Sequence, residues 1–209
     1  MARLIRRGVA PLAIGTVLSL LMQANALAAT VNVDISNFAF TPGVVKLRQG
    51  DTVQWTNTTG ATTHTATSNG IGSVTNGVGL WDTGNIPGGG TDSFAFTTAS
   101  KYPYYCMIHP TMVGTVQVAL KATPPSGGVG TTFKIQWATG GVPAGFDVQV
   151  QISRPGGPGF VLWLNNQTAN FANFMPDAGT GEYRFRARLQ NNTTGKYATF
   201  SAAKSIMVT

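Results

Sequence analysis

Hydrophobic residues recur at every second position through most of this chain, and that alternation constrains the fold more than any other feature. Val31, Val33 and Ile35 alternate with polar residues, and Val53 and Trp55 repeat the pattern further along. Successive side chains of a strand point to opposite faces, so such runs predict short strands that are buried on one side. Gly-, Asn-, Pro- and Ser-rich clusters separate the runs, and no helical stripe follows residue 29. We therefore predict an all-β fold built from sandwiches.

The alternation reaches residue 118 and then meets a Pro- and Gly-rich segment, residues 122–128. Proline cannot donate to a strand ladder, so this segment is the best candidate for a linker. A second series of alternating runs follows it. We predict two modules, residues 29–121 and residues 122–209, and each length suits a small β-sandwich.

The first residues have the pattern of a secretory signal peptide. Three arginines precede an apolar run, residues 8–22, and an Ala-x-Ala triplet ends at Ala28. A retained membrane anchor is the competing interpretation, but a span needs about 20 apolar residues and Pro11 interrupts this run. We predict a signal peptide over residues 1–28, with cleavage after Ala26 as the near alternative. The protein would then be exported, periplasmic or extracellular, with no integral membrane segment after cleavage.

Charge is sparse and unevenly distributed. Charged residues make up 10% of the chain. Residues 29–121 carry four basic and four acidic side chains, whereas residues 122–209 carry seven basic and three acidic ones. A nucleic-acid role needs a denser basic patch, so no nucleic-acid partner is expected. In the second module Arg184, Arg186 and Arg188 line one strand face, which is either a solvated surface or a docking site for an anionic surface or acidic partner.

The chain has one cysteine and two histidines, and three metal-ligand candidates fall within seven residues. Cys106, His109 and Met112 follow one another at intervals of three. Strand-like flanks and Pro110 make a helix unfavourable here, so we expect all three on one tight loop between strands. The only other histidine is His64, and a fourth ligand would come from its loop.

The residue types then select among metals. Two imidazoles, one thiolate and a weak Met ligand describe a type 1 copper site. Zinc accepts Cys and His but seldom Met, and c-type haem attachment needs a second cysteine. A thiol nucleophile would need a positioned acid or amide, which the sequence does not identify. A lone cysteine is ordinarily a small core residue, so the combined pattern, not Cys106 alone, indicates copper.

Residues 31–118 resemble a small cupredoxin of the plastocyanin/amicyanin group. The matching pieces are Phe-Thr-Pro at 40–42, Gly-Asp-Thr-Val-Gln-Trp-Thr-Asn at 50–57, His64, Tyr-Pro-Tyr-Tyr-Cys at 102–106 through His109 and Met112, and Gly-Thr-Val at 114–116. The Cys-x2-His-x2-Met spacing is similar to that of amicyanin. The resemblance implies that residues 29–121 form a Greek-key cupredoxin sandwich holding one copper ion. Its implied ligands are His64, Cys106, His109 and Met112.

The resemblance also implies a function. The protein would shuttle single electrons between a redox protein donor and a redox protein acceptor, with Cu(II)/Cu(I) cycling and no enzymatic turnover. His109 would be the near-surface ligand, and electrons would leave across an apolar patch around Pro110. Copper buffering or delivery is the alternative function, with Met107 as its only hint. Nitrite reduction and multicopper oxidation need further imidazole-bound coppers, and both histidines are already used.

Two positions depart from the cupredoxin pattern. Many relatives place Asn after the first histidine and Ser or Thr after the cysteine, and these residues link the two ligand loops. Here the positions are Thr65 and Met107, so we expect that link to be lost. Residues 122–209 resemble an immunoglobulin/fibronectin type III-like sandwich, with Trp137 on an early strand and Tyr183 on a late one. An exported adhesion protein, in which this second module is the active part, is a further interpretation.

Overall fold

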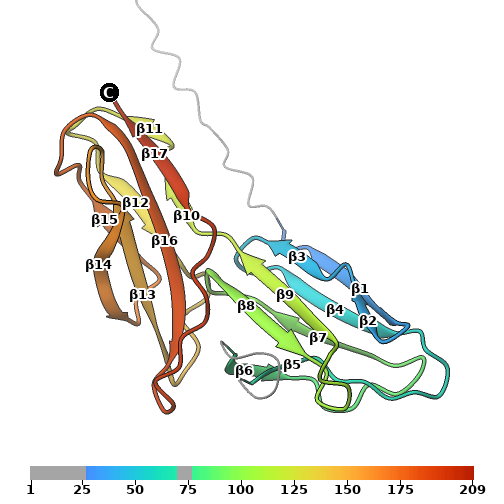
Figure 1. Ribbon diagram of the computed structural model, residues 1–209. Helices are drawn as coiled ribbons and strands as arrows, with labels where there is room; N and C mark the ends of the chain where they lie inside the picture. Colours follow the sequence, from blue (N-terminus) through green and yellow to red (C-terminus); the bar gives the residue numbers. More distant parts are fainter. Residues whose placement is uncertain (1–26, 70–76) are drawn as a thin grey trace, which may run out of the picture.

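The computed structural model describes residues 27–69 and 77–209, and within these ranges the chain is all-β, as predicted (Figure 1). The regular structure of the described residues consists of strands joined by turns and loops. None of these residues lies in a helix long and apolar enough to cross a bilayer. The predicted signal peptide falls outside the described residues, except for its last two positions.

Residues 30–118 form two sheets. The first has the order β2-β1-β4-β7, with β1 (Thr30–Ser36), β2 (Ala39–Thr41), β4 (Thr52–Asn57) and β7 (Thr91–Ala95). The second has the order β3-β9-β8-β5-β6, with β3 (Val44–Leu47), β5 (Thr67–Asn69), β6 (Val78–Asp82), β8 (Ser100–Tyr105) and β9 (Val113–Val118). β1 and β4 pair in parallel, as do β3 and β9, and the other neighbours are antiparallel. The parallel pairs exist because the chain crosses between the sheets, as a Greek-key sandwich requires.

The core of this sandwich follows from the alternation. In β4, Val53, Trp55 and Asn57 are buried while the residues between them are partly exposed. The Trp55 ring stacks on that of Trp81 with centroids 5.9 Å apart, and Tyr104 meets Trp55 edge-on at 5.6 Å. Aromatic rings bury much apolar area and favour these offset and edge contacts. The inner faces of the two sheets are therefore joined by interlocking rings.

Residues 121–208 also form two sheets. One has the order β10-β12-β15, with β10 (Lys121–Thr123), β12 (Phe133–Gln136) and β15 (Phe171–Phe174). The other has the order β11-β17-β16-β13-β14, with β11 (Ser126–Gly127), β13 (Phe146–Ser153), β14 (Phe160–Gln167), β16 (Gly181–Asn191) and β17 (Lys204–Val208). This arrangement is a second β-sandwich. The boundary between residues 121 and 122 stays a prediction.

The segment predicted as a linker, residues 122–128, is instead part of this second sandwich. β10 pairs with β12 and β11 pairs with β17. Pro124 and Pro125 lie between the two short strands, where no ladder donor is needed, and the carbonyl of Pro125 accepts a hydrogen bond from the Met207 amide at 3.0 Å. The prolines thus interrupt the pairing without releasing the chain from the sheet.

A seam of main-chain hydrogen bonds joins the two sandwiches. The amide of Ala99 donates to the Trp137 carbonyl at 2.6 Å, and the amide of Thr139 donates to the Thr97 carbonyl at 2.9 Å. Lys101 at the start of β8 forms an antiparallel bridge with Thr199. One cluster of buried side chains contains residues of both sandwiches. Nothing in the sequence pattern signalled this seam, because main-chain bonds between distant loops need no particular side chain.

Candidate metal centre

His64 lies in the loop between β4 and β5, and main-chain bonds hold it there. Its amide donates to the Ile86 carbonyl at 3.1 Å, and the Ile86 amide donates back at 2.8 Å. Asn57, fully buried at the end of β4, donates from Nδ2 to the carbonyls of Thr62 and Ile86 at 2.7 and 2.8 Å. The loop is therefore anchored at both ends, and the His64 side chain is directed inward with no exposed surface.

The second ligand loop joins β8 to β9 and closes on itself. The Cys106 amide donates to the Met112 carbonyl at 3.0 Å, and the Met112 amide donates to the His109 carbonyl at 2.9 Å. These bonds confirm the tight loop predicted from the three-residue spacing. Cys106 and Met112 are buried, whereas His109 is half-buried and Pro110 is exposed.

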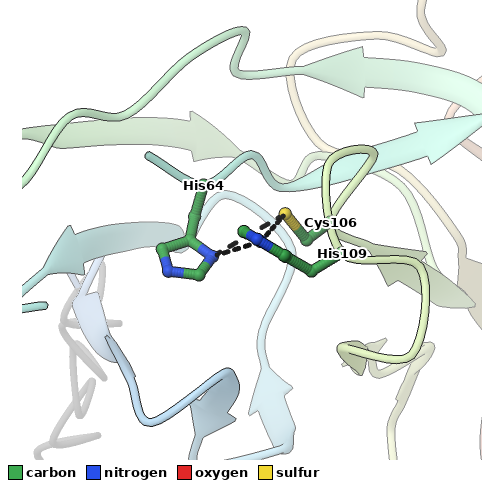
Figure 2. A group of neighbouring side chains, drawn as sticks. All are labelled: His64, Cys106 and His109. Atoms are coloured by element: carbon green, nitrogen blue, oxygen red, sulfur yellow. Dashed lines mark hydrogen bonds between the residues drawn. The ribbon is translucent and has the colours of Figure 1, made fainter. Parts of the chain in front are cut away.

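The two loops bring three donor atoms together. Nδ1 of His64 and Nδ1 of His109 are 3.1 Å apart, and Sγ of Cys106 lies 3.8 Å from the first and 3.7 Å from the second. Figure 2 shows the two rings turning these nitrogens toward each other and toward the sulfur. Of the described residues, only these three form such a cluster of His, Cys, Asp or Glu donors, within 4.8 Å of one another.

Thr65 links the two ligand loops, so the expectation that this link is lost was wrong. Its amide donates to Sγ of Cys106 at 3.3 Å, and its hydroxyl oxygen accepts from the Met107 amide at 2.8 Å. The hydroxyl of Thr67 can in turn donate to Thr65 Oγ1 at 3.2 Å. The relatives' pattern places Asn at this position, whereas here the threonine oxygen supplies the acceptor for the Met107 main-chain amide.

Phe38 is a site residue that the sequence reasoning missed. Its ring meets His109 edge-on with centroids 4.9 Å apart and meets His64 at 5.7 Å. It has a φ of 57°, which is uncommon for a residue with a side chain. The ring is 58% exposed, and Met107 and Ile108 are each 47% exposed. The half-buried His109 therefore lies within an apolar rim, and only the position of Phe38 in a turn could have hinted at its part in it.

The donor atoms fit a soft metal ion. Burial first, and then the nearby His109 ring, lower the pKa of His64 below its usual value, which favours a neutral imidazole with a free lone pair. Three lone-pair donors that face each other in a buried pocket repel unless protons or a cation lie between them. No carboxylate belongs to this cluster, so hard oxygen-seeking ions such as Mg²⁺ and Ca²⁺ have no ligand there. A thiolate with two imidazoles suits copper.

The match to a known protein family agrees with this chemistry. Residues 27–119 match the model of the copper-binding plastocyanin/azurin family. The solved structures that the chain is similar to include a reduced Cu(I) form of an amicyanin variant at pH 4, with 28% identity over 46% of this chain and 88% of that one, at a TM-score of 0.37. A second amicyanin variant in its Cu(I) form has 28% identity and the same coverages, at a TM-score of 0.38. No curated protein matches. The family match and the donor set identify copper as the metal of this site.

Proposed function

We propose that this protein carries single electrons between other proteins, on the premise that residues 27–119 are a copper-binding cupredoxin domain. The observation that supports it best is the convergence of His64, Cys106 and His109 from two anchored loops. We propose these three as copper ligands and Met112, buried at the end of the same loop, as the weak fourth. When bound, copper supplies a one-electron couple between Cu(II) and Cu(I).

The surrounding residues favour transfer of an electron over chemistry on a substrate. His64 and Cys106 are fully buried, so no small molecule can reach them from solvent without displacing protein. His109 reaches the surface within the rim formed by Phe38, Met107 and Ile108. A partner that contacts this rim would approach the metal through one imidazole. The main-chain bonds that close the loop hold the ligands in place, which keeps reorganisation small.

The finer parts of the proposal concern export and the second module. We propose that the protein is exported, as the apolar run and the Ala-x-Ala triplet indicate. We also propose that residues 122–209 are fibronectin type III-like. Tyr183 supports this, because its hydroxyl donates to the Gly179 carbonyl at 2.9 Å and accepts from the Ala178 amide at 2.7 Å. A buried tyrosine that bonds the main chain just upstream is a tyrosine corner, a mark of such sandwiches.

The test begins with the copper-loaded protein. A copper–thiolate bond gives an intense visible absorption band, which we expect in the wild type and not in Cys106→Ser. Rapid electron self-exchange between Cu(I) and Cu(II) forms would support the carrier function. A colourless wild type that prefers zinc would contradict the copper site itself.

Copper delivery is the second candidate function, and the exposed thioether of Met107 beside the site is the observation in its favour. Thioethers bind Cu(I) and can pass it to a receiving site. Slow self-exchange together with rapid copper loss to a chelator would support delivery. Met107→Leu separates the two functions, because it would slow transfer of copper to an acceptor and leave electron self-exchange unchanged.

A further inference from the structure

The outer face of the larger sheet in the second sandwich carries a row of guanidinium groups. Arg184, Arg186 and Arg188 alternate along β16 with fully buried core residues, so all three point away from the core. We call them the arginine row. β16 lies between β13 and β17 (Figure 1). The arginine row therefore runs along the middle of the sheet face and not along its edge.

Aromatic rings hold two of these groups in place. Cζ of Arg186 lies 4.2 Å from the ring centre of Phe160 and 4.4 Å from that of Phe200. Cζ of Arg188 lies 3.9 Å from the ring centre of Tyr197 and 4.4 Å from that of Phe200. A guanidinium over an aromatic face is attracted by the ring quadrupole and loses conformational freedom. The two side chains are thus fixed before any partner binds.

Neutral groups orient Arg186 and Arg188 without cancelling their charge. Arg186 donates from Nε and Nη2 to Oε1 of Gln151 at 2.8 and 2.6 Å, and Arg188 donates from Nε to Oε1 of Gln149 at 2.9 Å. Among the described residues, the one ion pair joins two residues outside the row. Burial first, and then the charge of the neighbouring arginine, lower the pKa of Arg186. Arg186 and Arg188 are therefore oriented cations, with Arg184 next to them on the same face, and none of the three is in the ion pair.

We propose that the arginine row is a docking surface for an acidic segment of a partner protein, a proposal independent of the electron-carrier function. Alternate residues of a strand are about 7 Å apart, so an extended segment with a carboxylate at every second residue matches the spacing of the row. Guanidinium groups bind carboxylates through paired hydrogen bonds. A hollow lined by Arg188, Tyr197 and Phe200 lies at one end of the row and can receive a carboxylate side chain.

The residues beside the row favour a protein over a lipid or polysaccharide. Gln151 pairs with Arg186 on one side and with Leu162 on the other, so these three side chains share one face. Leu162 is 55% exposed. Arginine, aromatic and apolar side chains together are typical of protein interfaces. A sugar chain or a layer of lipid headgroups offers little apolar surface for the exposed Leu162 to contact.

Binding to fluorescein-labelled peptides tests this proposal on the intact, copper-loaded protein. The first peptide alternates Glu and Thr. Its isomer repeats Glu-Glu-Thr-Thr and, when extended, places carboxylates on each face only at every fourth residue. We expect the alternating peptide to bind several-fold more tightly than the isomer, and binding to weaken as salt is added. Equal binding of the two peptides would overturn the match in spacing.

A pair of triple variants separates the arginine row from net charge. Replacing Arg184, Arg186 and Arg188 by Gln should weaken binding of the alternating peptide at least about tenfold. The matched control replaces three exposed lysines outside the row by Gln and removes the same charge: Lys46, Lys121 and Lys134. Circular dichroism and the visible band confirm that both variants fold. An equal loss in both would refute the proposal, as would tighter binding of wild type to vesicles of anionic phospholipid or to dextran sulfate than to the alternating peptide.

Discussion

Thr65→Val tests whether one hydroxyl couples the two ligand loops. Valine has the shape of threonine but cannot accept the hydrogen bond from the Met107 amide, which is 2.8 Å long in the structure. Thr67 keeps an acceptor, because its hydroxyl also lies 2.8 Å from Oδ1 of Asp82. The loss is therefore confined to one bond. An ordinary hydrogen bond contributes about 0.5–1.5 kcal/mol, which corresponds to about a 2-fold to 12-fold change in a rate. Water can reach the partly buried amide, so we expect the lower half of that range.

The assay is the rate at which excess chelator bleaches the visible band. Copper leaves when the loop that carries Cys106 opens, so loss should be faster in Thr65→Val than in wild type. Thr65→Ser keeps the oxygen and is the control, with a rate near that of wild type. The Thr65 amide still donates to Cys106 Sγ in both variants, because that bond uses the main chain. A Thr65→Val protein that retains copper as long as wild type would refute the coupling.

Three further predictions concern stability. In Gly88→Ala the new Cβ would lie 1.3 Å from the carbonyl oxygen of Gly60, a main-chain atom that cannot shift without distorting its loop. Urea unfolding should therefore show that the free energy of unfolding falls by at least about 3 kcal/mol. Burial raises the pKa of Asp147, whose Oδ1 has no hydrogen-bond partner. The charged carboxylate therefore destabilises the fold as pH rises through that pKa. Asp147→Asn should be more stable than wild type at neutral pH but not in acid. Arg154 holds the pKa of Asp177 below its usual value. Asp177→Ala should therefore lower the free energy of unfolding by about 0.5 kcal/mol at neutral pH, a value discounted because the ion pair is exposed. The difference in stability between wild type and variant should vanish as pH falls through that lowered pKa.

The alternation predicted the strands because burial on one face imposes it directly. Val53 and Trp55 are inward in β4 as their spacing requires, and the alternation in β16 placed Tyr183 in the core and the arginines outside. The linker prediction failed at residues 122–128 for a physical reason. Proline excludes a donor at its own position only, and the residues on either side of Pro124 and Pro125 are free to pair.

The ligand residues of the metal centre were predictable because their side-chain chemistry is unusual. The contacts that depend on backbone conformation or on main-chain hydrogen bonds were not. Cys106 and His109 stand out because such donors are rare in the chain, and the structure brings their donor atoms together with that of His64. Phe38 is one of many phenylalanines, and its contact with His109 depends on a turn of unusual φ. The sequence also does not reveal that Thr65 accepts the hydrogen bond from the Met107 amide, because any nearby oxygen could accept it.

The seam fixes the strand that precedes Cys106 to the second sandwich. Lys101 bonds Thr199 through both main-chain groups, and Ser100 Oγ donates to the Thr199 carbonyl at 3.0 Å and accepts from the Leu189 amide at 3.3 Å. The same strand, β8, ends immediately before Cys106. A flexible tether would leave the position of β8 independent of the second sandwich, whereas these bonds fix the start of β8 to β16. The arginine row lies on β16 as well, so a partner held by the row would occupy a fixed position relative to the copper site instead of moving freely about it.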